Sequence, residues 1–514
     1  MTCVLQAFDG NQKNAWPKVY FCGVPCMWSD TAFLIPSTSH ARSWTDVTHT
    51  YLHTHACTSL RALGSGGATV YVGYDDDDRI LASPEARAAL AELHPHLAFR
   101  WTAFSPDKGN VVRIWNALAE QALQDGKAYL MVAGDDIVYP QEESTTWLQT
   151  LRGSLRAQHH VGWASGFSGN DRIATQFLVH KTHVQLLGWV FPPAMRNWYC
   201  DDFLNEVYPS TYRAWHKDVQ IPNAGGTERY TPNVEHRALC DQLVAQHRAP
   251  LARAIEARVA AEAQEREHLI LHHHVHVQRE MTKLRSPVWD QFVDKLRMKA
   301  FCAARGVRTP LTKQIFQSPY DDIDLLALQQ PFILKSNKGC GRNLIVRDGI
   351  MLSSGWAHHH KRLADHLADV PGLLRSWSLP YCNKEHEPQY EYTTPQVYEE
   401  EFMDPIPDDM EVWVHQGTAR FVWVATDRFG QNTRTVCDAH FRPMPFQMHG
   451  RKPTACFTPP PVHLRDAIIR TAEIVAADVP MDFLRIDLYV KDDVVHCGEI
   501  TLSSQGGTGR CTRV

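Results

Sequence analysis

The sequence predicts a multidomain protein with an α/β sheet half and an α+β half, joined by a long helix. Its 514 residues exceed what one hydrophobic core usually serves. Strand-like and helical patterns alternate after residue 68, whereas residues 233–284 are rich in Ala, Glu, Arg and His and have strong helix propensity. We therefore expect an irregular N-terminal cap (1–67), a sheet domain (68–232), a helical linker (233–284) and a second domain (285–514).

Composition excludes several classes of protein. A chain that is 44% hydrophobic and 21% charged is an ordinary globular one, and a net charge of -5 leaves no basic footprint for nucleic acid. The start carries no leader pattern and no apolar run reaches about 18 residues, so we expect a cytoplasmic protein without a membrane span. The 13 cysteines are scattered, which predicts reduced thiols, with Cys22 and Cys26 as loop cysteines rather than half a metal site.

The α/β expectation for the first half depends on one repeated pattern. Buried, β-branched runs alternate with segments whose apolar residues recur at helical spacing. In order, the pattern predicts a strand over 68–74, a helix over 83–93, a strand over 97–104, a helix over 111–123 that ends before Gly126, and a strand over 128–134. Strand, helix and strand in alternation are typical of an α/β sheet.

Acidic residues follow these strands where they end. The run Asp75–Asp78 follows the first strand, and Asp135 and Asp136 follow the last. Ligands of open α/β sheets bind beyond the carboxyl ends of the strands, and a metal that bridges a diphosphate needs carboxylate ligands. Asp135 and Asp136 are therefore candidate metal ligands, Asp75 a candidate nucleotide contact, and Asp202 a candidate base for an acceptor hydroxyl. Solvated strand ends are the alternative.

Strands recur in the second half, mostly as antiparallel pairs, which predicts an α+β domain. The strand-like runs cover 331–337, 342–349, 395–403, 410–417, 419–429 and 483–502, the last with a turn at Asp492 and Asp493.

The first of these strands carries a lysine and runs into a glycine turn. Lys335 stands among apolar residues, and a buried lysine needs an anion nearby. The turn is formed by Lys338, Gly339, Cys340, Gly341 and Arg342. Glycines allow backbone N–H groups to approach a phosphate closely, so the segment is a candidate triphosphate loop.

The last hairpin gathers charged residues on one face. Arg485 and Asp487 alternate with apolar residues, and Glu499 and Thr501 alternate on the partner strand. Two carboxylates beside an arginine suit Mg²⁺ held by a triphosphate. A salt-bridged, solvated hairpin is the rival interpretation.

The order of these motifs resembles the TupA-like ATP-grasp family. The matching segments are DKLRMKAF with Asp294 and Lys295, FILKSNKGCG, VYEEEFM, DMEVWVHQG, FLRIDLY and GEITLSSQGG. The resemblance implies a C-terminal ATP-grasp domain that binds ATP and Mg²⁺. It places Lys335 against the adenine-side phosphates, the Gly339–Arg342 loop over the phosphates, and Glu400 and Glu401 on the hinge strand near adenine and ribose.

The same resemblance implies that Arg485 meets the γ-phosphate and that Asp487 and Glu499 hold Mg²⁺. Two departures from the family pattern stand out. Thr501 replaces a common asparagine, and Glu411 replaces a common lysine, so one metal ligand and one phosphate contact are in doubt.

The acids of the first half resemble those of GT-A glycosyltransferases, family 2 in particular, over residues 68–212. That resemblance implies a Rossmann-like sheet and a nucleotide sugar bound with Mn²⁺ or Mg²⁺. It assigns Asp136 and Asp135 to the metal, Asp75 to the nucleotide and Asp202 to the base. The sequence GDD stands where the family usually separates the two acids.

Together the two resemblances imply a bifunctional enzyme of glycan assembly. One half would transfer sugar from a nucleotide sugar, and the other would use ATP to couple a carboxylate to an amine on a polysaccharide or peptide-decorated glycan acceptor. Two alternatives remain open. One is an ATP-grasp ligase or kinase of a small acid or peptide with a non-catalytic N-terminal domain, and the other is a decayed glycan-binding scaffold.

Overall fold

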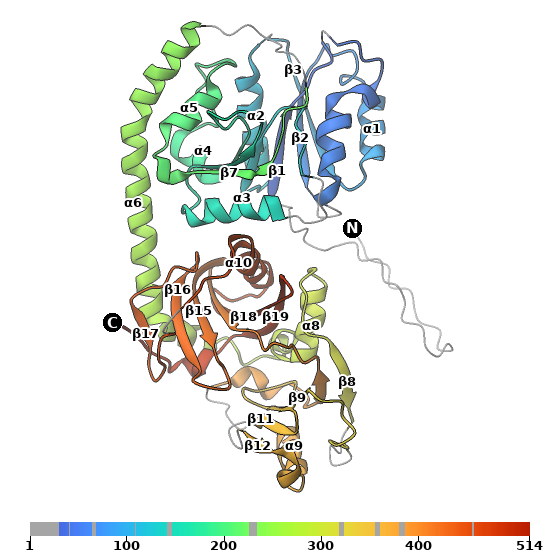
Figure 1. Cartoon of the computed structure of the whole chain (residues 1–514), viewed down its shortest axis with the longest axis vertical. Coiled ribbons are helices and arrows are strands. Elements are labelled where there is room, and N and C mark those ends of the chain that lie inside the picture. The colour runs from blue at the N-terminus through green and yellow to red at the C-terminus, as the bar shows by residue number, and fades with distance from the viewer. Residues whose placement is uncertain are drawn as a thin grey trace, which may run out of the picture.

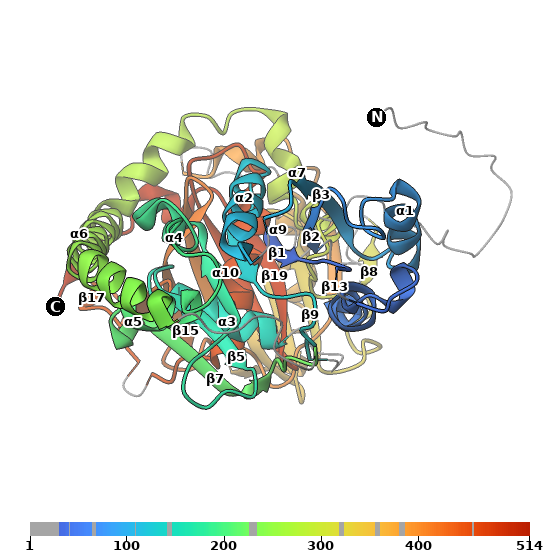
Figure 2. The same cartoon turned by 90° about the horizontal axis from the view of Figure 1, so that it is seen from above.

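A computed structural model shows two modules joined by a long helix (Figure 1). The structure describes residues 30–514 except 41, 64–67, 108, 141–145, 226–233, 318–322, 355–359, 380–385 and 455–456. We call residues 30–225 the N-terminal module and residues 282–514 the C-terminal module. Helix α6 (Val234–Met281) connects them and runs along both (Figures 1 and 2).

The N-terminal module is built on one seven-stranded sheet in the order β3-β2-β1-β4-β6-β5-β7. The first four strands in this order are parallel, and β6 runs antiparallel to both of its neighbours. The strands are β1 (Thr31–Pro36), β2 (Thr69–Asp75), β3 (Ala98–Phe104), β4 (Tyr129–Val132), β5 (Trp163–Phe167), β6 (Phe177–His180) and β7 (Arg213–Gln220). The helices are α1 (Pro84–Leu93), α2 (Val111–Gln124), α3 (Thr146–Ala157), α4 (Lys181–Leu187) and α5 (Cys200–Val207). The alternation that the sequence predicts over 68–134 is confirmed.

The expected irregular cap is wrong for residues 31–63. Thr31–Pro36 forms β1 at the centre of the sheet, paired with β2 and β4, and Leu52–Cys57 adds a helical turn with buried residues. A parallel strand that is buried on both faces is a short apolar run without alternation. Such a run of six residues carries little signal, which explains the miss. Residues 1–29, with Cys22 and Cys26, lie outside the described residues.

The described strands of the C-terminal module pair only in antiparallel fashion within their sheets, as the sequence predicts. A six-stranded sheet holds β12 (Lys361–Arg362), β11 (Ile350–Ser354), β10 (Asn343–Arg347), β9 (Phe332–Ser336), β13 (Val397–Glu400) and β8 (Thr312–Phe316). A five-stranded sheet holds β16 (Thr433–Asp438), β15 (Thr418–Thr426), β14 (Asp409–His415), β18 (Phe483–Lys491) and β19 (Val494–Thr501). Strands β17 (Phe446–Met448) and β20 (Cys511–Arg513) form a pair, and the helices are α7 (Asp290–Val293), α8 (Lys295–Ala303), α9 (Val370–Ser378) and α10 (Val462–Ala476).

Buried ion pairs join the two modules where α3 packs against α10. Arg152 of α3 makes a bidentate pair with Asp30 at 2.8 and 3.0 Å, and Arg470 of α10 reaches the same carboxylate at 3.1 Å. Arg156 of α3 contacts the fully buried Asp466 of α10 at 3.3 Å. Because an unpaired buried charge is costly, these contacts fix how the modules meet.

We predict that Asp30→Asn destabilises the protein by about 2 kcal/mol at neutral pH, between the cost of breaking an exposed pair and that of breaking a buried one. The intermediate value follows from the 35% exposure of the Asp30 side chain against 1% for Arg152. Urea unfolding of the variant measures this. Glu267→Gln, which breaks the exposed pair with Arg513, is the control and should cost less than about 1 kcal/mol.

The effect of Asp30→Asn should depend on pH. Burial alone would raise the pKa of Asp30, but Arg152 and Arg470 hold it well below its usual range. A lowered pKa contributes stability above the pKa of the unfolded chain, about 3.9, and that stability is lost as pH falls further. The difference between wild type and variant should therefore persist at neutral pH and shrink below about pH 3.9. An equal difference at both pH values would contradict the ion-pair account.

Cysteines and helices in the described part of the chain bear on two of the expectations from composition. Its eight cysteines are all free, and seven of them are buried. None of its helices has the length and apolarity needed to cross a membrane.

Candidate functional site

Two adjoining cavities lie between the two large sheets of the C-terminal module. The larger has a volume of about 440 Å³ and the smaller about 160 Å³. The residues that line both are Lys335, Cys340, Gly341, Asn343, Arg428, Arg434 and Tyr489. The larger cavity is more apolar and the smaller one is highly charged. A purine base needs an apolar pocket and its phosphates need a charged one, so the two cavities together suit a purine nucleotide.

The larger cavity has apolar walls with a polar edge. Its apolar side chains include Pro310, Ile333, Ile345, Phe402, Met403, Ile406, Pro407 and Phe429. Glu400 and Glu401 lie on the edge, at the end of β13 and just after it. Glu401 accepts a hydrogen bond from the backbone N–H of Leu311 at 3.2 Å. Such a pocket can hold a flat aromatic base, as the resemblance implies for the hinge strand.

A pair of lysines surrounds the buried carboxylate of Glu400. Lys335 on β9 contacts one of its oxygens, and Lys299 on α8 contacts the other at 2.8 Å. Burial would raise the pKa of Glu400, but the two ammonium groups hold it below its usual range. The two ammonium groups and the single carboxylate carry a net positive charge, so a phosphate that entered the cavity would be attracted to this cluster.

The predicted hairpin has the expected register. Arg485 pairs with Thr501 and Asp487 with Glu499 across β18 and β19, so all four side chains share one face. Asp487, Glu499 and Arg485 line the smaller cavity together with Gly339, Gly341 and Arg342. The structure therefore brings the predicted phosphate loop against the predicted metal ligands.

Each of the two carboxylates on the hairpin is neutralised by a cation. Arg485 makes a bidentate pair with Asp487 at 2.7 and 2.8 Å, and Lys295 of α8 contacts Glu499 at 3.2 Å. Burial raises the pKa of Asp487 in spite of Arg485. Burial would also raise the pKa of Glu499, but Lys295 holds it below its usual range. Bound Mg²⁺ would take the place of Arg485 and Lys295 beside these carboxylates and would bring a higher positive charge to them.

Glu411, the departure from the family pattern, has cations of its own. It lies 2.5 Å from Arg434 on β16 and 3.2 Å from Arg485. Arg434 and Arg428 line both cavities. A neighbouring strand and loop thus provide positive charge where the family often has a lysine.

Lys338 takes a different place from the one predicted for it. Its side chain is 2% exposed and donates to the backbone carbonyl of Thr393 at 3.2 Å, and it lines neither cavity. Sequence patterns did not point to Lys299, Arg428 or Arg434. Only Lys299 carried a usable signal, because it stands four residues after Lys295 and therefore on the same face of one helix.

In the N-terminal module, Asp135 and Asp136 follow β4 at the carboxyl end of the parallel strands. Asp135 is 1% exposed and accepts a hydrogen bond from the Ser37 hydroxyl at 2.8 Å. Asp136 is less buried and lies under the loop at Gly225, where a Cβ atom would come within 2.0 Å of its carboxylate. Only glycine fits there, so the loop is built around this carboxylate.

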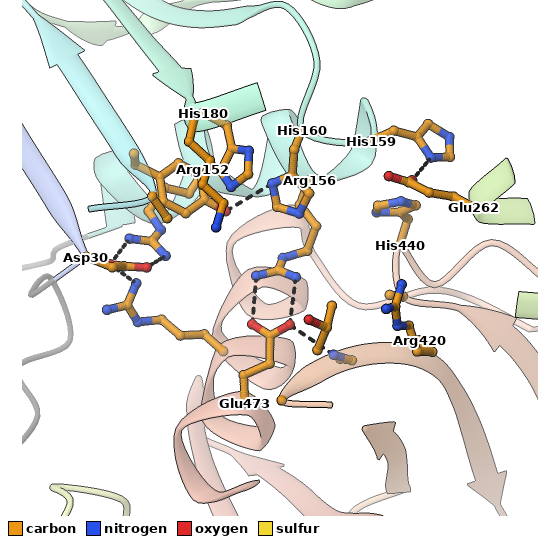
Figure 3. Close-up of a pocket in the computed structure, with 18 of the residues that line it drawn as sticks. Asp30, Arg152, Arg156, His159, His160, His180, Glu262, Arg420, His440 and Glu473 are labelled. Atoms are coloured by element: carbon orange, nitrogen blue, oxygen red, sulfur yellow. Dashed lines mark hydrogen bonds and ion pairs between the residues drawn. The ribbon is translucent and has the colours of Figure 1, made fainter. Parts of the chain in front are cut away.

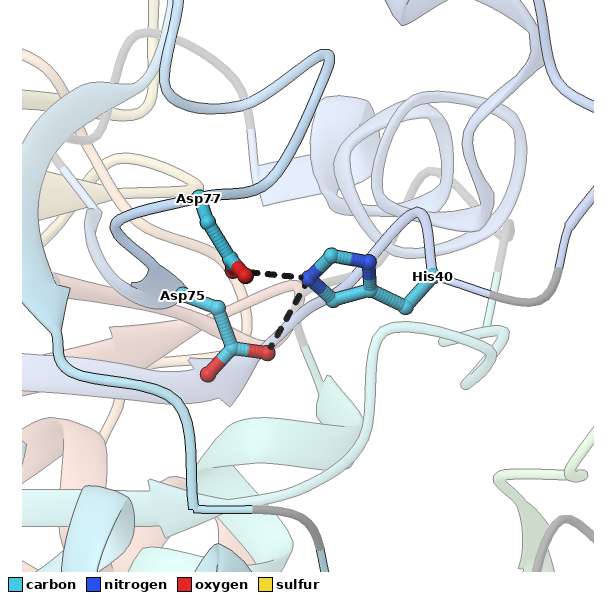
Figure 4. Close-up of side chains that lie close together, drawn as sticks. All are labelled: His40, Asp75 and Asp77. Atoms are coloured by element: carbon cyan, nitrogen blue, oxygen red, sulfur yellow. Dashed lines mark hydrogen bonds and ion pairs between the residues drawn. The ribbon is translucent and has the colours of Figure 1, made fainter.

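Asp75 lies at the same edge of the sheet, at the end of β2. His40 contacts Asp77 at 2.9 Å and Asp75 at 3.8 Å (Figure 4). Within the described residues, these three are the only group that brings three metal-ligating side chains within ligand distance. Asp78, in contrast, is 1% exposed and accepts from the backbone N–H groups of Ile80 and Leu81, so it caps a turn.

Asp202 is not brought to the strand-end acids by any contact among the described residues. It lies on α5 and pairs with Arg237 of α6 at 3.2 Å. Its neighbour Asp201 has a pKa raised to about 7 by burial and by the charge of Asp202. The base role of Asp202 stays a prediction.

Comparison with known families gives a match in the C-terminal half. The model of the family described as TupA-like ATPgrasp matches residues 276–512. The expected ATP-grasp fold of this half is thereby confirmed, and the match begins within the last turns of α6. A search of curated proteins gives no match.

Similar solved structures fall into two groups. The L-amino acid ligase from Bacillus licheniformis is 12% identical with a TM-score of 0.26; the alignment covers 42% of this chain and 44% of the ligase, so the chain spans less than half of that protein. The D-alanine–D-alanine ligase from Bacillus anthracis, complexed with ATP, is 15% identical with a TM-score of 0.22, covering 41% of this chain and 53% of that one. The mannosyltransferase PcManGT from Pyrobaculum calidifontis, in complex with GDP-Man and Mn²⁺, is 15% identical with a TM-score of 0.30. The alignment covers 48% of this chain and 68% of the mannosyltransferase. At these TM-scores the likenesses carry no argument about activity.

Proposed function

We propose that the C-terminal module binds MgATP and uses it to join a carboxylate to an amine. The observation that carries the proposal is the pair of adjoining cavities, in which an apolar chamber edged by Glu400 and Glu401 opens onto a charged one lined by Lys335, Asp487 and Glu499. The match of residues 276–512 to an ATP-grasp family supports the same nucleotide.

The proposed reaction has two steps. A carboxylate oxygen of the acid substrate attacks the γ-phosphorus of ATP, which forms an acylphosphate and releases ADP. The amine then attacks the acyl carbon and phosphate leaves, so one ATP is consumed for each bond formed. The chain would contribute positioning and charge neutralisation, with Arg485, Arg428 and Arg434 near the phosphates.

The donor set of the smaller cavity fits Mg²⁺. Asp487 and Glu499 are hard oxygen donors on adjacent strands, and Mg²⁺ usually takes one or two protein carboxylates plus phosphate oxygens. When bound, the ion would draw charge away from the transferred phosphoryl group. Thr501, whose hydroxyl donates to Asp487 at 3.2 Å, would orient that carboxylate.

The proposal is tested by ADP formation. The full chain is incubated with MgATP, a panel of carboxylic acids that includes uronic acids, and a panel of amino acids, and ADP and coupled product are measured. ADP release that depends on both an acid and an amine supports a ligase. Release that depends on an acid alone, with a stable phosphorylated product, would replace the ligase with a kinase. No release with any pair, although MgATP binds, favours the decayed scaffold.

We further propose that the N-terminal module binds a nucleotide sugar and transfers its sugar. The supporting observation is that Asp75, Asp135 and Asp136 all follow parallel strands of one sheet at its carboxyl edge, where a diphosphate and its metal would bind. With both halves active, the chain would be a bifunctional enzyme of glycan assembly, and its Mn²⁺ or Mg²⁺ ligands would be Asp136 and Asp135.

We predict that Asp136→Asn lowers metal-dependent turnover of a nucleotide sugar by about 10²-fold or more, because a hard oxygen ligand of the metal is lost. Release of UDP or GDP from a panel of UDP- and GDP-sugars with Mn²⁺ measures this. Asp171→Asn, at a carboxylate that is 83% exposed in the same module, is the matched control and should leave turnover unchanged. Equal turnover in wild type and Asp136→Asn would remove Asp136 from the metal site.

A further inference from the structure

A third cavity, of about 590 Å³, lies between the two modules. It is lined by the amino ends of β1 and β4, by α3, by the middle of α6 and by β15 and α10 (Figure 3). None of its lining residues belongs to either cavity of the ATP-grasp site. It also lies at the amino end of the parallel strands, opposite to the acids at their carboxyl end.

The lining of this interdomain cavity is strongly cationic. Seven lysine and arginine side chains line it, against three carboxylates. Each of these carboxylates forms an ion pair with arginine: Asp30 with Arg152 and Arg470, Glu473 with Arg156, and Glu262 with Arg258.

The three most exposed cations of the lining come from both modules. Lys181, at the start of α4, is exposed, and its ammonium group makes no hydrogen bond or ion pair with any residue that the structure describes. Arg420 on β15 pairs at 3.2 Å with Glu265, which does not line the cavity. Arg258 on α6 has one ion pair, at 3.0 Å with Glu262, and its side chain is 36% exposed.

Histidines complete the wall, and burial lowers the pKa of three of them, His160, His180 and His440. His440 is 7% exposed, and its Nδ1 has no hydrogen-bond partner among the described residues. Burial and neighbouring positive charges lower the pKa of His180 to about 3 and that of His160 well below its usual range. The positive potential of the cavity therefore comes from its lysine and arginines and not from His160, His180 or His440. The neutral imidazoles of these three residues can donate hydrogen bonds to a ligand.

We infer that this interdomain cavity is a binding site for a small multivalent oxyanion, a phosphate ester or a polycarboxylate, held by cations of both modules. Lys181 and Arg258 would contact it from the side of the N-terminal module and α6, and Arg420 from the C-terminal module. A ligand that contacts both modules stabilises the joined arrangement relative to any in which they part.

Calorimetric titration of the full chain tests the inference. Sodium pyrophosphate and trisodium citrate are the probes, without divalent metal. We expect at least one of them to bind, and Lys181→Gln, Arg258→Gln and Arg420→Gln each to weaken binding about tenfold or more, about 1.4 kcal/mol per tenfold. Lys335→Met, in the ATP-grasp site, is the matched control and should leave the affinity unchanged. Binding of pyrophosphate alone identifies a phosphate ester, and binding of citrate alone a polycarboxylate.

Four outcomes would overturn the inference, and any one of them is sufficient. The first is that neither anion binds the wild type at millimolar concentration. The second is that binding is lost in Lys335→Met, which would place the anion in the ATP-grasp site. The third is that Lys181→Gln keeps the wild-type affinity. Because the Lys181 side chain is exposed and makes no contact that folding needs, its substitution does not endanger folding, and this variant alone is decisive. An effect of Lys181→Gln and Arg258→Gln without one of Arg420→Gln would refute contact with both modules.

Discussion

MgATP should raise the unfolding temperature of the wild-type protein and leave that of the double variant Asp487→Asn/Glu499→Gln unchanged. At a hundredfold excess over the dissociation constant, binding to the folded state adds about 2.7 kcal/mol. For a domain of this size, each kcal/mol corresponds to roughly 2–4 °C. The variant lacks both hard oxygen ligands that face each other on β18 and β19, so Mg²⁺ loses its protein ligands.

ADP formation gives a second measure of the same change. Removal of both carboxylates should lower it by about 10³-fold, since charge on the transferred phosphoryl group is no longer neutralised. Asp493→Asn, in the exposed turn of the same hairpin, is the control for both measurements. If the double variant unfolds without ligand, Glu499→Gln alone is used, because Asp487 then keeps its pair with Arg485. A wild-type response to MgATP in the folded variant would show that the metal binds elsewhere.

Lys335→Met should weaken MgATP binding by about 10–100-fold. A hydrogen bond to a charged group contributes about 1.5–3 kcal/mol, and Lys335 lines both cavities of the site. Folding should survive, because Glu400 keeps Lys299 as a partner at 2.8 Å. Titration with MgATP, followed by calorimetry, measures the loss.

The matched control for Lys335→Met is Lys313→Met. Lys313 lies on the edge strand β8 of the same sheet, pairs with Glu399 at 2.9 Å, and lines neither cavity. Its substitution removes the same charge from the same sheet without touching the proposed nucleotide. An affinity of Lys335→Met within about twofold of the control would exclude a phosphate contact by Lys335.

Local patterns in the sequence predicted much of the ATP-grasp site. Alternation along a strand decides which side chains share a face, so the amino-acid order alone places Arg485, Asp487, Glu499 and Thr501 together. The glycines at 339 and 341 adopt positive φ angles of 82° and 68°, as expected of a loop that turns tightly.

What the sequence could not predict depends on contacts between distant segments. Arg434 meets Glu411 only because β16 and β14 both pair with β15, and no local pattern distinguishes Arg434 from the other arginines of the chain. Asp30 and Arg470 are 440 positions apart, and Asp30 lies in a region that reads as irregular. Ion pairs of this kind are determined by the packing of distant segments, so they cannot be predicted from composition or periodicity.

The orientation of the N-terminal sheet limits how the two proposed reactions could share a substrate. Asp30 and Tyr129, at the amino ends of β1 and β4, face the C-terminal module. Asp75 and Asp136 therefore stand one strand length away on the outer side, about 13–23 Å for strands of four to seven residues. A small product of one site would therefore have to diffuse over this distance to reach the other. A glycan chain long enough to reach around the molecule could occupy both sites at once, so simultaneous binding of one substrate at both sites implies a polymer.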